Sequence, residues 1–149
     1  MSRAFVKDSD EELAANELPE RPLSVEPNYV TVHGMEALRA RLKDLQDERD
    51  RLAAAAEPMA KQRLLEVKRD IRYFGAQIER ATVVDPAGQP RDEVHFGASV
   101  TMRDEHGKTH TFHIVGDDEA DVGAGSISWA SPLARAMLGG KVGDTVKWQ

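Results

Sequence analysis

The feature that most constrains the fold is an apolar repeat over residues 35–82. Apolar side chains recur at steps of three, four and seven at Leu38, Leu42, Leu45 and Leu52, and again at Leu64, Val67, Ile71, Phe74, Ile78 and Ala81. This is the spacing of a coiled-coil seam. Pro58 divides the repeat, because proline lacks the amide that a continuing helix needs but suits the first turn of a new one. The sequence therefore predicts an antiparallel helical hairpin with its turn at Glu57 and Pro58 and with arms of about 33 Å.

The residues before this hairpin form a separate acidic segment. Residues 1–28 contain seven acidic and three basic side chains, and three prolines break any periodicity. Such a composition favours disorder. We therefore predict a disordered acidic tail (1–28), a coiled-coil hairpin (29–85) and a C-terminal domain (86–149). The formal net charge of -6 argues against a protein that coats nucleic acid by bulk electrostatics.

The C-terminal residues change from a helical to a β pattern. After the turn-rich stretch 86–90, apolar residues alternate over 94–102 and 109–115, and the letters DEHG at 104–107 supply a turn between them. A short extended piece at 126–129 precedes a short helix that starts at Ser131 and Pro132 and ends before Gly139. The alternation of apolar residues over 142–148 predicts a further strand. The pattern predicts a small α+β domain in which a twisted sheet holds one helix.

Candidate metal and catalytic motifs in this domain do not have the geometry that they need. The acids at 117, 119 and 121 are spaced like a calcium loop, but the required glycine and final glutamate are missing. His106 lies in the turn, and His110 and His113 are three residues apart on one strand, so they should point to opposite faces. The chain contains no cysteine nucleophile and no serine elbow motif. We therefore expect neither a metal site nor an enzymatic active site.

A basic run in the second helix has two interpretations. Lys68, Arg69 and Arg72 follow one another closely, but acidic residues intersperse them. A solvated helix face is the interpretation that these acids favour. The alternative is a set of contacts to RNA or DNA phosphates.

A set of motifs spans most of the chain in a fixed order. They read VGDDEAD at 115–121, IS at 127–128, SPLARA at 131–136 and KVGD at 141–144, preceded by FGASV at 96–100 and VVD at 83–85. The letters MSRAFVK at 1–7 and PNYVT at 27–31 add a matching N-terminal start. Together these motifs resemble the Gre (GreA/GreB) transcript elongation factors, with an N-terminus that is similar to GreB.

This resemblance implies an α+β fold in which a coiled-coil hairpin precedes a small FKBP-like domain with one helix. It further implies that the small domain grips bacterial RNA polymerase at the rim of its secondary channel, while the hairpin enters the channel toward the active centre. By position in the family pattern, the polymerase-binding face would contain Asp117, Asp118, Glu119, Asp121, Ser131 and Pro132. The family pattern also continues into one more strand beyond Trp148. We therefore expect either a truncated domain with an unpaired edge or a domain that another chain completes.

The resemblance also sets expectations about partners and location. RNA or DNA contacts would occur only within the polymerase complex, and the chain would have no cofactor of its own. No apolar run approaches the ~20 residues of a membrane span, and no apolar signal segment opens the chain. We expect a monomeric, cytoplasmic protein that does not associate with membranes.

The hairpin tip departs from the family pattern. Family members carry an aspartate and, three residues on, a glutamate that help to hold the second magnesium of the polymerase, which activates the water that cleaves backtracked RNA. Here Glu57 is the only acid in 53–61, and the hairpin is shorter than the family pattern by about two turns per arm, a deficit of about 10 Å. We therefore predict an atypical member that occupies the channel and regulates elongation without stimulating RNA cleavage.

The tip and the C-terminal domain also suggest other functions. Glu57 could still support cleavage, alone or with Asp50 seven residues earlier on the same predicted helix face. The short hairpin could instead regulate a nucleotide-handling enzyme. A prolyl isomerase, which an FKBP-like fold would suggest, is disfavoured because an aromatic content of 5% leaves few residues for an aromatic pocket.

Overall fold

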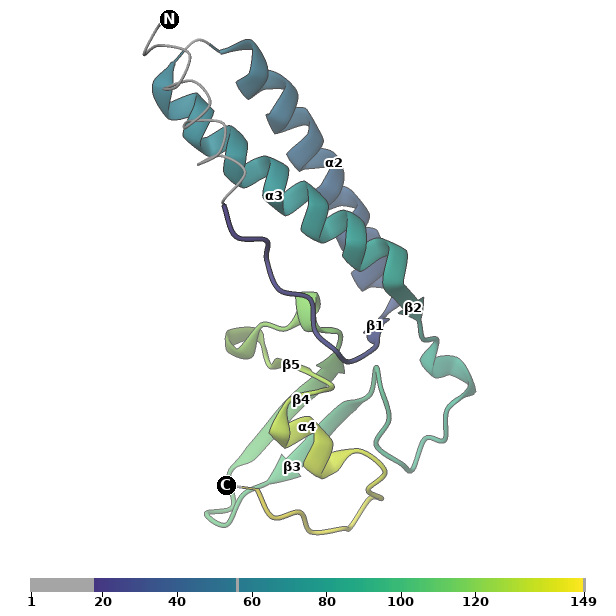
Figure 1. The fold of residues 1–149 in the computed structure, drawn as a ribbon. Helices are drawn as coiled ribbons and strands as arrows, with labels where there is room; N and C mark the ends of the chain where they lie inside the picture. Colours follow the sequence, from purple (N-terminus) through teal and green to yellow (C-terminus); the bar gives the residue numbers. More distant parts are fainter. Residues whose placement is uncertain (1–17, 56, 149) are drawn as a thin grey trace, which may run out of the picture. The chain divides into compact units, whose positions relative to one another are not determined.

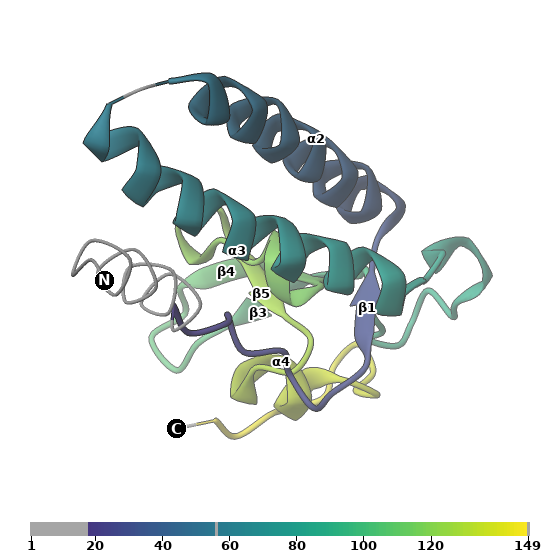
Figure 2. The same ribbon diagram turned by 45° about the horizontal axis from the view of Figure 1, so that its top comes forward.

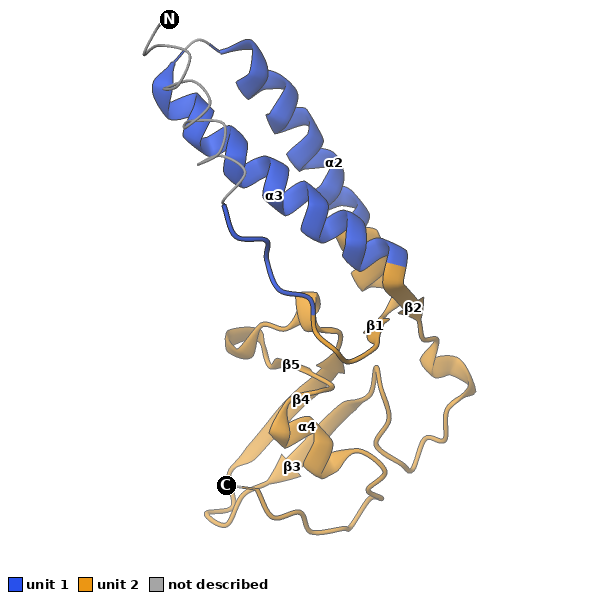
Figure 3. Ribbon diagram, viewed as in Figure 1, with its two compact units in different colours: residues 1–23, 39–79 blue, residues 24–38, 80–149 orange. Residues whose placement is uncertain are grey.

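The computed structural model describes residues 18–55 and 57–148 (Figure 1). Its helices and strands are, in order, β1 (Asn28–Val30), α2 (Val32–Ala54), α3 (Pro58–Arg80), β2 (Ala81–Val83), β3 (Ser99–Arg103), β4 (Thr109–Val115), β5 (Ser126–Ser128) and α4 (Pro132–Met137). The chain divides into two compact units (Figure 3). Unit 1 contains Met1–Leu23 and Arg39–Glu79, and unit 2 contains Ser24–Leu38 and Arg80–Gln149.

The two long helices lie side by side and supply most of unit 1 (Figures 1 and 2). Each has 23 residues, which corresponds to about 34 Å. Leu45 and Val67 are fully buried at 0% exposure, whereas the other seam positions within unit 1 are half-buried. In a hairpin of two helices, only the one facing helix covers each seam side chain. The predicted hairpin is confirmed, and α3 begins at Pro58.

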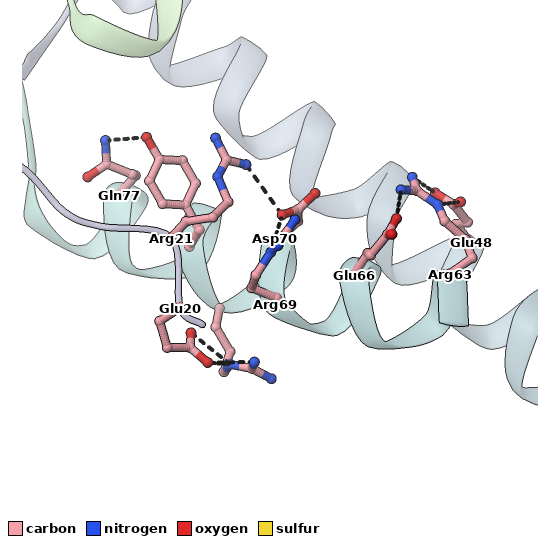
Figure 4. Close-up of polar contacts among 10 residues, drawn as sticks. Glu20, Arg21, Glu48, Arg63, Glu66, Arg69, Asp70 and Gln77 are labelled. Atoms are coloured by element: carbon pink, nitrogen blue, oxygen red, sulfur yellow. Dashed lines mark hydrogen bonds and ion pairs between the residues drawn. The ribbon is translucent and has the colours of Figure 1, made fainter. Parts of the chain in front are cut away.

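A charged contact joins the two helices away from the apolar seam. Arg63 on α3 donates from Nε and Nη2 to the two oxygens of Glu48 on α2, at 2.7 and 3.2 Å, and from Nη1 to Glu66 at 3.2 Å (Figure 4). These hydrogen bonds lower the pKa of Glu48 and raise that of Arg63. The contact therefore joins α2 to α3 at the partly exposed edge of the hairpin.

Unit 2 contains two small sheets. β1 pairs with β2 in parallel, so the strands that precede and follow the helical hairpin meet at its base. In the other sheet, β3 pairs antiparallel with β4, and β4 pairs in parallel with β5. The turn between β3 and β4 includes Gly107, whose φ of +78° a glycine adopts without strain.

The core of unit 2 lies between the three-stranded sheet and α4. Ile114 and Ile127 from the sheet pack with Ala134 and Met137 from the helix. Ser131 caps α4 by accepting a hydrogen bond from the Ala134 amide at 3.3 Å. The predicted α+β fold, β-hairpin and short helix are confirmed.

The predicted strand over residues 142–148 is wrong. The chain instead turns sharply at this point: the Asp144 amide donates to the Lys141 carbonyl and the Asp144 carboxylate accepts from the Lys141 amide, both at 2.9 Å. Gly143 supports the turn with a φ of +95°. Alternating apolar residues form a strand only when a neighbouring strand pairs with their backbone, and within the described residues 142–148 belong to no strand ladder.

The described part of the predicted tail is irregular but makes specific contacts. Residues 1–17, the larger part of the predicted tail, lie outside the described residues. Residues 18–27 contain no helix or strand, yet in unit 2 the Arg80 side chain donates to the carbonyls of Ser24 and Glu26 at 2.9 and 2.6 Å. Arg135 binds the Glu26 carboxylate at 3.0 Å. Across the described residues, no helix is long and apolar enough to cross a membrane.

Candidate functional site

The first predicted site is the hairpin tip. α2 ends at Ala54 and α3 begins at Pro58, so Glu57 lies in the short connection between them. Glu57 and Pro58 are exposed, and the side chain of Met59 is 83% exposed. The described neighbours of Glu57 in sequence are alanine, proline and methionine. The tip therefore presents one carboxylate on a small apolar surface.

The structure separates Asp50 from Glu57. Asp50 lies on α2, where its carboxylate accepts a hydrogen bond from Arg49 at 3.2 Å, whereas Glu57 follows the end of that helix. Two residues share a helix face only while both belong to the helix. The expectation that the two acids share one helix face is therefore wrong, whereas a role in cleavage for Glu57, alone or with Asp50, stays a prediction.

The second predicted site is the acidic loop of unit 2, in which Asp117–Glu119 forms one turn of 3-10 helix. Glu119 points inward. Its carboxylate accepts hydrogen bonds from the Thr31 amide at 3.2 Å, from the Gly116 amide at 3.1 Å and from the Thr31 hydroxyl. The Thr31 hydroxyl in turn accepts from the Gly34 amide at 2.9 Å in the first turn of α2.

This inward position gives Glu119 a structural role that the sequence does not reveal. A Cβ at Gly34 would overlap the Glu119 carboxylate, so the close approach requires glycine there. The carboxylate therefore ties the acidic loop to the start of α2 inside unit 2. Such a tie makes the loop rigid, which suits a docking surface.

Three predicted residues of the loop point toward solvent. The side chains of Asp117, Asp118 and Asp121 are exposed, and Asp117 accepts a hydrogen bond from the Ser128 hydroxyl. The adjacent Val122 is 82% exposed. The loop thus presents carboxylates beside an apolar side chain, an arrangement that fits a basic protein surface with a small apolar recess.

The two remaining predicted residues lie at the start of α4. Ser131 is half-buried because its hydroxyl caps the helix, and Pro132 is exposed at the first helical position. Their local roles agree with the sequence pattern. Their part in binding a partner stays a prediction.

Two histidines of the β3–β4 hairpin contact nearby polar groups. His110 contacts Asp104 at 3.0 Å, which lowers the pKa of the Asp104 carboxyl, and His113 contacts the Ser99 hydroxyl at 2.6 Å. His106 is exposed in the turn. Within 18–55 and 57–148, no three side chains of the types His, Cys, Asp and Glu are placed so that they could hold a metal ion.

The basic run on α3 is largely engaged with acids of unit 1. Arg72 contacts Glu20 with its closest nitrogen at 2.6 Å, and Arg69 contacts Asp70 at 3.3 Å (Figure 4). Lys68 is exposed. Sequence reasoning missed the contact with Glu20, because the partners are 52 residues apart and no periodic pattern links them.

Comparison with known proteins matches the C-terminal part of the chain to a family and most of the chain to individual proteins. The family described as "Transcription elongation factor, GreA/GreB, C-term" matches residues 89–149. A transcription elongation factor GreA from Novosphingobium aromaticivorans is 35% identical over 138 residues, which cover 83% of this chain and 87% of that protein. A transcription elongation factor GreB from Neisseria meningitidis is 35% identical over 135 residues, which cover 80% of this chain and 83% of that protein.

A solved structure of a prokaryotic transcription elongation factor GreA/GreB from Nitrosomonas europaea is also similar, at 23% identity. It covers 83% of this chain and 85% of its own, with a TM-score of 0.38. The assignment rests on the sequence relatives, which span both the helical hairpin and the C-terminal domain. On these relatives, the chain belongs to the GreA/GreB family of transcription elongation factors, which are not themselves enzymes.

Proposed function

We propose that this protein binds RNA polymerase, places its hairpin in the secondary channel and regulates elongation without stimulating RNA cleavage. The observation that carries the proposal is the tip, where Glu57 is exposed among apolar residues. Magnesium takes several oxygen ligands in near-octahedral geometry. A single carboxylate adds little to such a set of magnesium ligands. The tip therefore occupies space near the active centre of the polymerase and leaves the chemistry of that centre unchanged.

The acidic loop supports the binding half of the proposal. Asp118 and Asp121 are exposed on a loop that Glu119 holds in place, and Pro132 is exposed at the start of α4. Exposed charges on a rigid support give orientation and rapid encounter with a basic partner. The compartment expected for this activity is the cytoplasm, where the polymerase works.

Co-purification with core RNA polymerase tests the binding half. Wild type is expected to form a stable complex, which Asp118→Arg and Pro132→Ala weaken. Glu105→Arg is the matched control, because Glu105 is an exposed acid of the same unit in the β3–β4 turn. Absence of a complex at micromolar wild-type concentration, or equal weakening by Glu105→Arg, would count against the proposed docking face.

A cleavage assay on backtracked transcription complexes tests the catalytic half. Wild type and Glu57→Ala are both expected to leave the rate of RNA cleavage at its level without factor. Stimulation by wild type that Glu57→Ala removes would show instead that Glu57 is a working metal ligand.

A gain-of-function variant separates the two deficiencies of the tip, the missing acid and the short arm. Ala54→Asp would place an aspartate three residues before Glu57, the spacing that the family resemblance implies. If the missing acid alone silences the tip, this variant should stimulate cleavage. If the short arm also prevents contact, cleavage should stay at its basal rate while the complex with polymerase still forms.

A further inference from the structure

The inference concerns residues 24–26, which we call the tail bend and which belong to unit 2 together with α4 (Figure 3). The Arg80 side chain donates to the carbonyls of Ser24 and Glu26 at 2.9 and 2.6 Å. The Ser24 hydroxyl accepts a hydrogen bond from the Glu26 amide at 3.1 Å. On α4, Arg135 lies 3.0 Å from the Glu26 carboxylate. The tail bend is therefore fixed on unit 2 through its backbone and through its acidic side chain.

The side chain at the centre of the tail bend lies in solvent. Val25 is 99% exposed, although the carbonyls of the residues before and after it are held by Arg80. Its side chain therefore contributes almost no buried apolar area to the fold. A partner that contacts Val25 finds the segment already ordered, which lowers the entropic cost of binding.

The tail bend lies against the helix that carries part of the proposed docking face. Arg135 follows Pro132 by three residues, so the two side chains lie on one side of α4, where Pro132 is exposed. Glu26 contacts Arg135 from the tail bend, and Val25 adjoins Glu26 in the chain. A protein surface that covers Pro132 therefore reaches the tail bend as well.

The ion pair between Glu26 and Arg135 also suits a basic partner. Both side chains stay partly exposed, Glu26 at 39% and Arg135 at 53%. Without Glu26, Arg135 would add a positive charge to a docking face whose acidic loop presents carboxylates, and this charge would repel a basic surface. Pairing with Glu26 offsets the charge of Arg135, so the docking face as a whole stays negative.

We propose that Val25 is an apolar contact residue for RNA polymerase and that Glu26 is the positioning residue that holds Val25 on the docking face. The partner surface would combine basic side chains, which meet the acidic loop, with an apolar recess that receives Val25. This inference rests on the proposed binding to RNA polymerase. It extends the docking face from the acidic loop and α4 to the N-terminal tail.

The affinity of the full chain for purified core RNA polymerase tests the contact, with biolayer interferometry as the readout. Val25→Asn removes the apolar side chain without adding charge, and asparagine is a favoured residue in turns. It should weaken binding about five- to twentyfold, since partial burial of a valine side chain contributes about this factor. The matched control is Val142→Asn, because Val142 is 88% exposed in the same unit but follows the opposite end of α4. It should leave the affinity within about twofold of wild type.

The outcomes separate this inference from the proposed function on which it rests. Absence of a complex with wild type would overturn both. A wild-type complex that Val25→Asn leaves unchanged, or that Val142→Asn weakens equally, would overturn the inference alone. Urea unfolding of both variants should match that of wild type because neither valine is buried, which separates a lost contact from lost folding.

A charge swap tests the positioning role of Glu26. Glu26→Arg places two positive charges together, so it should release the tail bend and weaken binding about fivefold or more. Adding Arg135→Glu restores the ion pair in the reverse direction and should return the affinity to within about twofold of wild type. In the Val25→Asn background, Glu26→Arg should cause a smaller loss, because the side chain that Glu26 positions is missing. Equal losses in both backgrounds without rescue by the swap would show direct contact of Glu26 with the polymerase and overturn its positioning role.

A second copy of the chain is the other partner that an exposed valine could meet. Sedimentation velocity of wild type over a range of micromolar concentrations should show a monomer. A concentration-dependent dimer that Val25→Asn disperses would assign Val25 to a contact between copies and would overturn the proposal.

Discussion

At the scale of single residues, the acidic loop shows that one charge can serve structure while its neighbours face solvent. Glu119 receives three hydrogen bonds from Thr31 and Gly116, whereas Asp118 and Asp121 are exposed. A partly buried carboxylate that accepts several backbone hydrogen bonds is costly to replace, because the amides lose their acceptor. Loss of Glu119 would therefore disturb the loop before it disturbed any contact with a partner.

Glu119→Gln is predicted to destabilise unit 2 by about 1–3 kcal/mol, since an amide nitrogen cannot accept the hydrogen bonds that a carboxylate oxygen accepts. Urea unfolding followed by tryptophan fluorescence measures this, because Trp129 and Trp148 both belong to unit 2. Asp121→Asn makes the same change in charge at an exposed position and should shift stability by less than about 0.5 kcal/mol. Equal effects of the two substitutions would show that the inward carboxylate has no special role.

At the scale of elements, the hairpin combines a narrow apolar seam with charged contacts along its edges. Leu45 and Val67 are the fully buried seam residues of unit 1, so little apolar area holds the tip half of the helices together. The contact between Glu48 and Arg63 adds specificity across that half. Thin hairpins of this kind depend on both the apolar seam and the charged contacts, because neither contributes more than a few kcal/mol alone.

Glu48→Gln is predicted to lower hairpin stability by about 0.5–1 kcal/mol at neutral pH. The hydrogen bond from Arg63 lowers the folded-state pKa of Glu48 below its ordinary value of 4.5, so the contribution is complete above that value and is lost as the pH falls through the lower folded pKa. The difference between variant and wild type should therefore shrink as the pH is lowered below 4.5. Thermal unfolding followed by circular dichroism over an acidic pH series measures it, and a difference that is constant with pH would contradict the assignment.

How well the sequence anticipates these elements depends on the distance between the interacting residues. The hairpin and its turn follow from a local repeat and from Pro58, and the capped helix α4 follows from Ser131 and Pro132. The tie between Glu119 and Thr31 joins residues 88 apart, and no local pattern encodes it. Residues 142–148 fail as a strand because alternation describes one chain segment, whereas a strand requires a partner.

At the scale of the whole molecule, the proposed function predicts a kinetic signature. A protein that obstructs the secondary channel slows nucleotide entry without altering the chemistry of addition. Elongation rates measured against nucleotide concentration should therefore show a raised apparent KM and an unchanged maximal rate. Asp118→Arg should reduce the effect at a given protein concentration, and Glu105→Arg should retain it. A lowered maximal rate at saturating nucleotide would instead indicate an effect on the catalytic centre.

The exposed connection between α2 and α3 has a consequence for how such proteins diversify. Glu57, Pro58 and Met59 are all exposed, so substitutions there remove little packing and should cost little folding free energy. The chemistry of the tip can therefore change from one homologue to another while the fold stays intact. For the same reason the tip can carry a photo-crosslinking amino acid, which would record the surface that the hairpin reaches in a living cell.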